Sequence, residues 1–259
     1  VEGEPSSYII TGDIEAMWLR DSTLQIWPFL RYVQEVPAIE RLVLGLINRQ
    51  ADCILLDPYA NAFYDRPKFG IHQGDMTEMV AGVHERKWEL DSLCFFLYLL
   101  SKYYDLTGND SAFSPRVVRT IALILDTFIV EQRRLNRGPY RFDRLTDNPI
   151  DTLSNEGLGP DSSYTGMIHS GFRPSDDACT YPFHIASNLF ASKVLTDLAQ
   201  LLSQRSDQDL SERAMLLAKE ISSGIEKHGI VSHADLGDIY CYEVDGLGGR
   251  NFMDDANLP

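Results

Sequence analysis

The stretch KWELDSLCFFLYLLSKYYDL (87–106) decides the fold class of this chain. Its apolar residues recur at spacings of three and four, which is the period of an amphipathic helix. The positions that carry the period are Leu90, Leu93, Cys94, Leu97 and Leu100. Thr107-Gly108 ends the pattern with a residue pair that favours helix termination. We therefore predict a helix over 87–106.

Five other segments show the same helical period, and strand signals are few. Pro37 and the Ser114-Pro115 pair are typical of helix starts, and Gly229 of a helix end. Strand signals are confined to residues 8–11 and 239–244. The other predicted helices are 21–34, 37–56, 115–136, 183–204 and 210–228. The sequence therefore predicts an all-α fold.

Two long loops, 57–86 and 138–182, separate the predicted helices and are rich in Gly, Pro and Asp. Loops of this length usually carry function in a compact domain. Helical hairpins with long loops gathered at one end suggest a ring of helix pairs. Six helices make half of a twelve-helix ring, and Leu258-Pro259 resembles the start of another helix. We expect the C-terminal part of the domain to be missing from this chain.

The composition excludes several classes of function. The 38 Asp and Glu residues outnumber the 23 Lys and Arg residues and give a formal net charge of −15. Such a charge repels a phosphate backbone and anionic membrane surfaces, so we expect no nucleic-acid or membrane partner. No run of eighteen apolar residues is present, so we expect no transmembrane helix. The four cysteines form no C-x-x-C pair, which argues against structural zinc.

The segment TGDIEAMWLRDS (11–22) combines an indole, a guanidinium and carboxylates. Carboxylates and guanidinium groups bind sugar hydroxyls in pairs, and an aromatic face covers the apolar side of a sugar ring. The alternative is a helix start in which Asp21 or Ser22 is the cap and Arg20 forms a surface ion pair.

The segment HERKWELDS (84–92) is a second cluster of polar residues. If it is helical, Glu85, Trp88, Glu89 and Ser92 share one face. The alternative is a solvated helix start with acidic residues in its first turn. His84-Glu85 lacks the second histidine of H-E-x-x-H, which excludes a zincin motif.

The segment SGFRPSDDAC (170–179) places two adjacent carboxyl groups beside Arg173. Different surroundings can give such carboxyls different pKa values, and a protonated one can donate to a leaving oxygen. The alternative is a turn in which Ser175 and Asp176 cap the following helix. A fourth group, YEVDG (242–246) with NFMDDAN (251–257), lacks the D-x-D-x-D-G ladder of a calcium loop. We expect no metal and no cofactor.

Together these segments, with DPYANAF (57–63), closely resemble glycoside hydrolase family 125 over nearly the whole chain. The resemblance implies an (α/α)6 toroid or barrel, of which residues 1–259 form the N-terminal and central part of a single catalytic domain. It also implies metal-independent, inverting, exo-acting hydrolysis that releases non-reducing terminal mannose from α-1,6-linked mannosides.

By the same resemblance, the general acid belongs to the Arg-Pro-Ser-Asp-Asp segment, and we favour Asp176 over Asp177. Arg20 and Asp21 would bind the terminal mannose. Further candidates for the pocket wall are Glu89, His169, Arg173, Asp177 and Asp254. The family's general base is a glutamate downstream of the Asp-Asp-Ala-Asn motif, and we expect it beyond this chain. The alternatives are a non-catalytic mannoside-binding relative and a toroid hydrolase acting on another sugar; a purely structural helical-repeat protein ranks last.

Overall fold

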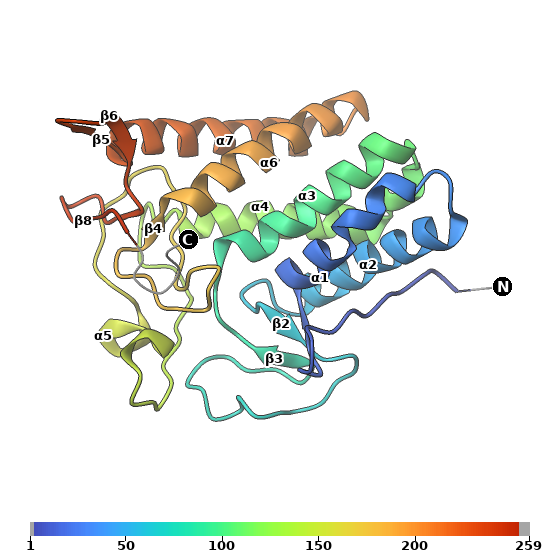
Figure 1. Cartoon of the computed structure of the whole chain (residues 1–259), viewed down its shortest axis with the longest axis horizontal. Helices are drawn as coiled ribbons and strands as arrows, with labels where there is room; N and C mark the ends of the chain where they lie inside the picture. Colours follow the sequence, from blue (N-terminus) through green and yellow to red (C-terminus); the bar gives the residue numbers. More distant parts are fainter. Residues whose placement is uncertain (1–2, 254–259) are drawn as a thin grey trace.

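The computed structural model describes residues 3–253, and helices dominate it (Figure 1). This confirms the prediction of a helical fold. The α-helices are α1 (Leu19–Ile26), α2 (Pro37–Leu56), α3 (Leu90–Thr107), α4 (Pro115–Glu131), α5 (Ser154–Gly157), α6 (Ile185–Gln204) and α7 (Gln208–His228). Short 3-10 helices are η1 (Trp27–Tyr32), η2 (Asp110–Phe113) and η3 (Pro149–Asp151).

Several helix ends differ from the predicted ones for local reasons. Helix α2 has the predicted bounds, with Pro37 in its first turn. Helix α4 ends at Glu131 rather than near 136, because Arg133 has a φ of 51° and cannot continue a right-handed helix. Helix α3 starts at Leu90 rather than 87, because the backbone of Lys87 and Trp88 is bonded to side chains from other segments.

The helices form two rows that lie side by side. Helix α3 packs against α1 and α6, and helix α4 packs against α2 and α7. The closest pairing is that of α6 with α7, which form a helical hairpin (Figure 1). The rows α1–α3–α6 and α2–α4–α7 are the arrangement expected of consecutive helix pairs in an α/α toroid.

Small antiparallel sheets connect the loops at one end of the first row. One sheet has the order β1 (Met17–Trp18), β2 (Ala62–Phe63), β3 (Val83–Glu85), and a second has the order β4 (Phe183–His184), β7 (Glu243–Val244), β8 (Arg250–Asn251). Strands β5 (Ile230–His233) and β6 (Gly237–Tyr240) form a hairpin. The strand predicted at 8–11 is wrong, since only Thr11 makes an isolated bridge there. The signal at 239–244 corresponds to the end of β6 and to β7.

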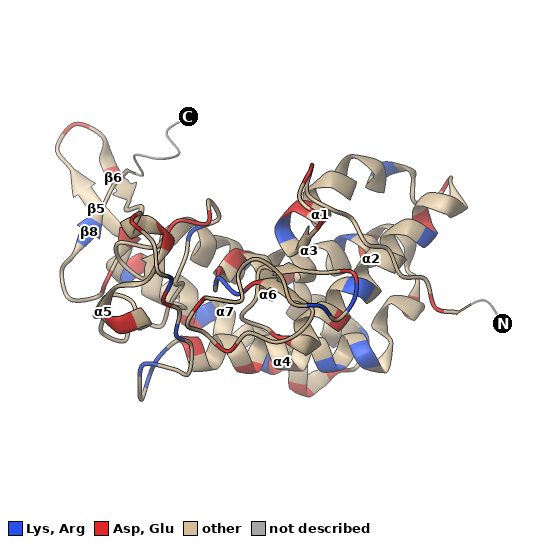
Figure 2. Ribbon diagram, turned by 90° about the horizontal axis from the view of Figure 1, so that it is seen from below, with Lys and Arg blue, Asp and Glu red and all other residues tan. Residues whose placement is uncertain are grey.

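The strands β1, β3 and β4 lead directly into, or shortly precede, helices α1, α3 and α6. The N-terminal ends of the first-row helices therefore share one end of the molecule with the long loops. Acidic residues are spread over both helices and loops, with Lys and Arg residues between them along the ribbon (Figure 2). Among the described residues, no helix is long and apolar enough to cross a membrane. All four cysteines are buried and unbridged.

Candidate active site

The first sheet brings three segments of the sequence to one place. Strand β1 pairs with β2 through Trp18 and Ala62, and Ala62 also pairs with Glu85 of β3. The backbone N–H of Leu19 donates to the carbonyl of Asn61 over 3.2 Å. The first turn of α1, the residue before β2 and the approach to α3 therefore meet, although they are separated by up to seventy residues in sequence.

Arg20 occupies the centre of this meeting point. Its Nη1 donates to Oε2 of Glu89 over 2.9 Å and to Oδ2 of Asp91 over 3.2 Å. Its Nε lies 3.6 Å from Oδ2 of Asp21. The side chain of Arg20 is 14% exposed, while Glu89 is fully buried and Asp91 is 4% exposed. A surface ion pair is therefore the wrong description of Arg20.

Asn61 connects this group to Asp176. Its amide nitrogen donates to Oδ1 of Asp176 over 3.0 Å, to Oε2 of Glu85 over 3.2 Å and to Oε1 of Glu89 over 3.4 Å. Its carbonyl oxygen accepts from the backbone N–H of Lys87 over 3.2 Å. One buried amide thus gathers three carboxyl groups that come from two different segments, 84–92 and 170–179.

Asp176 lies in a tight turn rather than at a helix cap. Its φ is 67°, and its backbone N–H donates to the carbonyl of Arg173 over 2.9 Å. The following helix, α6, begins at Ile185 and is capped by the side chain of His184, so the capping alternative for Asp176 is wrong. The ammonium group of Lys87 donates to the carbonyl of Asp176 over 2.8 Å and stabilises this turn.

The segment 84–92 is not the continuous helix face considered above. Glu85 ends β3, residues 86–88 have no regular secondary structure, Glu89 has an extended backbone and α3 begins at Leu90. The side chains of Glu89 and Ser92 are still in contact, because the hydroxyl of Ser92, in the first turn of α3, donates to Oε2 of Glu89 over 2.9 Å. The end of β3 and the residues that lead into α3 thus bring Glu85 and Glu89 to the same amide of Asn61.

The surroundings of Glu89 favour the protonated form of its carboxyl group. Burial raises the pKa of Glu89 well above its ordinary value; Arg20 opposes this, while Asp176 and Asp91 add to it. Burial also raises the pKa of Asp91, against the effect of Arg20. For Arg20, burial disfavours the charged form, but Glu89 and Asp91 outweigh it and raise its pKa. The guanidinium therefore stays charged while the carboxyls around it compete for one cation.

Three buried polar atoms, two of them on carboxyl groups that contact Arg20 and one on the indole two residues before it, have no hydrogen-bond partner among the described residues. They are the indole Nε1 of Trp18, Oδ2 of Asp21 and Oδ1 of Asp91. Unsatisfied buried polar groups are rare in native structures and commonly mark a ligand site. A donor and two acceptors beside a guanidinium match the mixed donor and acceptor character of sugar hydroxyls.

The remaining predicted residues lie around this cluster or outside it. Arg173 forms a buried ion pair with Glu243, with Nε to Oε1 at 2.6 Å and Nη2 to Oε2 at 3.1 Å. This pair ties the Asp176 turn to β7. Asp177 accepts a hydrogen bond from Ser175 over 3.0 Å in the same turn. A pocket-wall role for Arg173 and Asp177 stays a prediction.

His169 lies in the interior, with its ring centroid 6.4 Å from that of Phe183. Burial and the nearby Arg133 hold its pKa well below the ordinary value. Its carbonyl accepts from the indole of Trp88 over 2.8 Å, so it contacts the approach to α3 through its backbone. Asp254 lies outside the described residues. Within residues 3–253, no group of three or more His, Cys, Asp or Glu side chains is arranged to hold a metal ion.

Sequence reasoning missed Asn61, Asp91 and Lys87. All three lie in segments that were recognised, namely 57–63 and 84–94, but no role was assigned to them. The one local signal for Asp91 was its position in the first turn of a helix. That position is also explained by ordinary helix stabilisation, so it did not indicate a role in the site. Neither Asn61 nor Lys87 carries a local signal.

Rows of paired helices, with a carboxyl–guanidinium cluster at their loop-bearing end, place the chain in the class of α/α toroid proteins. The family model described as "Metal-independent alpha-mannosidase (GH125)" matches residues 1–259. The chain therefore belongs to glycoside hydrolase family 125, as the sequence motifs predicted.

Two relatives show the extent of this similarity. The chain is 37% identical to the Meiotically up-regulated gene 157 protein of Schizosaccharomyces pombe, over 98% of this chain and 53% of that protein. It superposes with a TM-score of 0.93 and 41% identity on a metal-independent alpha mannosidase of Streptococcus pneumoniae, solved as a non-productive complex with α-1,6-mannobiose. That match covers 98% of this chain and 60% of the solved one, so the chain spans little more than half of either relative.

Proposed function

We propose that the protein is an exo-acting, inverting α-mannosidase that releases terminal mannose from α-1,6-linked mannosides. The observation that carries the proposal is the convergence of Arg20, Asp21, Asp91 and Asp176 around the buried pair Asn61 and Glu89. Family membership supports mannosidase chemistry. The α-1,6-mannobiose in the solved relative supports the linkage.

In this proposal Asp176 is the general acid. Its carboxyl is partly exposed and shares the amide of Asn61 with the buried Glu89. A proton held among such close carboxyls can pass to the glycosidic oxygen as the bond breaks, with the electrons of that bond going to the leaving oxygen. Arg20 and Asp21 bind mannose hydroxyls beside it. An inverting enzyme needs a second carboxylate about 6.5–9.5 Å away to activate water, and we place this base beyond residue 259.

The test is proton NMR of α-1,6-mannobiose incubated with the full-length protein. Early appearance of β-mannose, before mutarotation, supports both the linkage and the inverting mechanism. Asp176→Asn should lower turnover by about 10²–10⁴ while binding of mannobiose changes little, as expected for loss of a general acid. Asp177→Asn is the matched control in the same turn. A larger effect of Asp177→Asn would move the acid to that residue, and release of α-mannose first would refute inversion.

A binding assay separates this proposal from the non-catalytic alternative. Calorimetric binding of mannobiose without any release of mannose would favour a mannoside-binding relative. Faster cleavage of an aryl α-glucoside than of an aryl α-mannoside would overturn the choice of sugar.

A further inference from the structure

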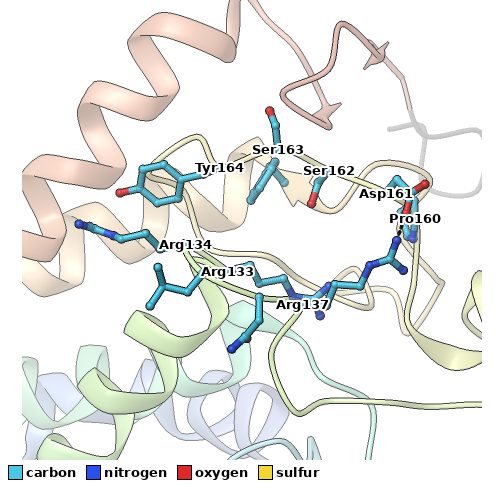
Figure 3. Close-up of a pocket in the computed structure, with 11 residues that line it drawn as sticks. Arg133, Arg134, Arg137, Pro160, Asp161, Ser162, Ser163 and Tyr164 are labelled. Carbon is cyan, nitrogen blue, oxygen red and sulfur yellow. Dashed lines mark hydrogen bonds and ion pairs between the residues drawn. The ribbon is translucent and has the colours of Figure 1, made fainter.

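A cavity of about 360 Å³ lies between the loop after α4 and the loop that follows α5 (Figure 3). None of its lining residues belongs to the group around Arg20 and Asp176. The volume is within the range of small-molecule sites. The polar residues that line it are Arg133, Arg134, Asn136, Arg137, Asp161, Ser162, Ser163 and Tyr164.

Arg133 is the lining residue that has a buried charged side chain. It has the left-handed φ noted above, and its side chain is only 6% exposed. Nε donates to Oε2 of Glu131 over 3.0 Å, but Nη2 is buried without a hydrogen-bond partner among the described residues. A non-glycine residue held in this backbone region is commonly found at a functional site. A buried guanidinium nitrogen without an acceptor calls for an oxygen supplied by something other than the described chain.

The charges around the cavity are balanced, and this decides the kind of ligand. Arg134 is paired with Glu220 at 2.9 Å, Arg137 is paired with Asp161, and Arg133 is paired with Glu131. Three cations matched by three carboxylates leave no net positive charge to attract an anion. The Arg137–Asp161 pair instead offers both donors and an acceptor, which is what a neutral polyhydroxylated ligand requires.

Tyr164 adds an aromatic surface to these polar groups. The residue is 43% exposed, and the guanidinium carbon of Arg134 lies 5.0 Å from the centroid of its ring. Figure 3 shows the Tyr164 ring and the serines on one wall, with the arginine-bearing loop opposite. An aromatic ring beside hydroxyl, amide and guanidinium groups matches the alternating apolar and polar faces of a pyranose.

We propose that this cavity is a second carbohydrate-binding site, which binds one pyranose unit of a mannoside apart from the Arg20–Asp176 cluster. The choice of mannoside rests on the proposed function, whereas the choice of a neutral sugar rests on the balanced charges. The Arg137–Asp161 pair binds its hydroxyls, and Tyr164 contacts its apolar face.

The test is a titration of the ¹⁵N-labelled full-length protein with α-1,6-mannotetraose, read from backbone amide shifts. Binding should move the amides of 133–137 and 160–164. Arg137→Ala removes a charge-assisted donor and should weaken binding at these amides about tenfold or more. Ser162→Trp should abolish it by filling the cavity. Arg141→Ala is the matched control, because Arg141 is an exposed arginine near this loop that does not line the cavity.

Each outcome of the titration either supports or overturns the proposal. Shifts at the cavity that disappear in Arg137→Ala or Ser162→Trp but persist in Arg141→Ala support it. Shifts confined to residues around Arg20 and Asp176 overturn it. Shifts at the cavity produced by inorganic phosphate but not by the tetraose also overturn it, in favour of an anion site. Since the titration does not require hydrolysis, failure of the proposed activity is recognised separately by the absence of released mannose.

Discussion

Replacing Lys87 by methionine should impair turnover without removing any group that we assign to the chemistry. The Lys87 ammonium donates to the carbonyl of Asp176 over 2.8 Å and to Oδ1 of Asp151 over 2.6 Å. Asp176 has a φ of 67°, and a non-glycine residue in that region costs about 1–3 kcal/mol unless its surroundings stabilise it. Lys87 is therefore a positioning residue that holds the backbone of the proposed acid.

The expected magnitude follows from the hydrogen bond that is lost. A hydrogen bond from a charged donor contributes about 1.5–3 kcal/mol. If that stabilisation maintains the position of the Asp176 carboxyl, its loss should lower kcat about ten- to hundredfold. KM should change less, because the hydrogen bonds of the ammonium are to Asp151 and Asp176 rather than to Arg20 and Asp21, which we propose bind the sugar.

The assay is mannose release from α-1,6-mannobiose by the full-length protein, with kcat and KM determined separately. Lys87→Arg keeps the charge and should restore part of the lost turnover. Asp151→Asn weakens the second anchor of the ammonium and should give a smaller loss. Burial acts to raise the pKa of Asp151, but Lys87 and Arg144 outweigh it and lower the pKa, so Asp151 is ionised at neutral pH. An unchanged kcat in a folded Lys87→Met protein, or a loss confined to KM, would refute this reasoning.

Three other substitutions test the same site. Arg20→Lys keeps the positive charge but replaces the planar guanidinium and its several N–H donors with a single ammonium group. It should raise KM for mannobiose about tenfold, measured by initial rates. Since burial raises the pKa of Glu89, the folded protein binds its proton more tightly than the unfolded one and loses stability as pH rises above the ordinary carboxyl value. Glu89→Gln should remove this dependence, seen in urea unfolding across a pH series as a slope change of up to about 1.4 kcal/mol per pH unit. Glu243→Gln leaves buried Arg173 without its carboxylate and should cost about 3–5 kcal/mol of unfolding free energy, measured by denaturant titration.

The helices were predictable because their apolar residues repeat with the helical period, and tertiary packing preserves that pattern. Their ends were less predictable. Lys87 and Trp88 continue the pattern of α3 in sequence, but their N–H groups donate to the side chains of Asn61 and Tyr140. Those acceptors come from segments 26 and 52 residues away, and no local rule can anticipate them.

The site was predictable in its residue types but not in its connections. Arg20, Glu89 and Asp176 were each found in segments rich in charged and aromatic residues. Asn61 was not, because a single amide in DPYANAF has no distinctive local pattern. Its role depends on the pairing of β2 with β1 and β3, and strands of two or three residues are too short to give an alternating signal.

The small number of hydrogen-bond donors available to the carboxyl groups around Asn61 bears on the proposed acid catalysis. Glu85, Glu89 and Asp176 all approach the amide nitrogen of Asn61, which carries only two protons. Of these three carboxyls, Glu89 also pairs with Arg20, and its carboxylate form is disfavoured by burial. Glu85 is paired with Arg144 at 2.9 Å and Glu89 with Arg20, so it is the burial of Glu89 that favours a proton on that carboxyl, beside Asp176. A fold that needed these residues only for stability would gain more by replacing them with apolar side chains, since removing buried ionic groups is often neutral or stabilising. We expect a proton favoured at Glu89 to serve the reaction proposed above, by transfer to a leaving oxygen at Asp176.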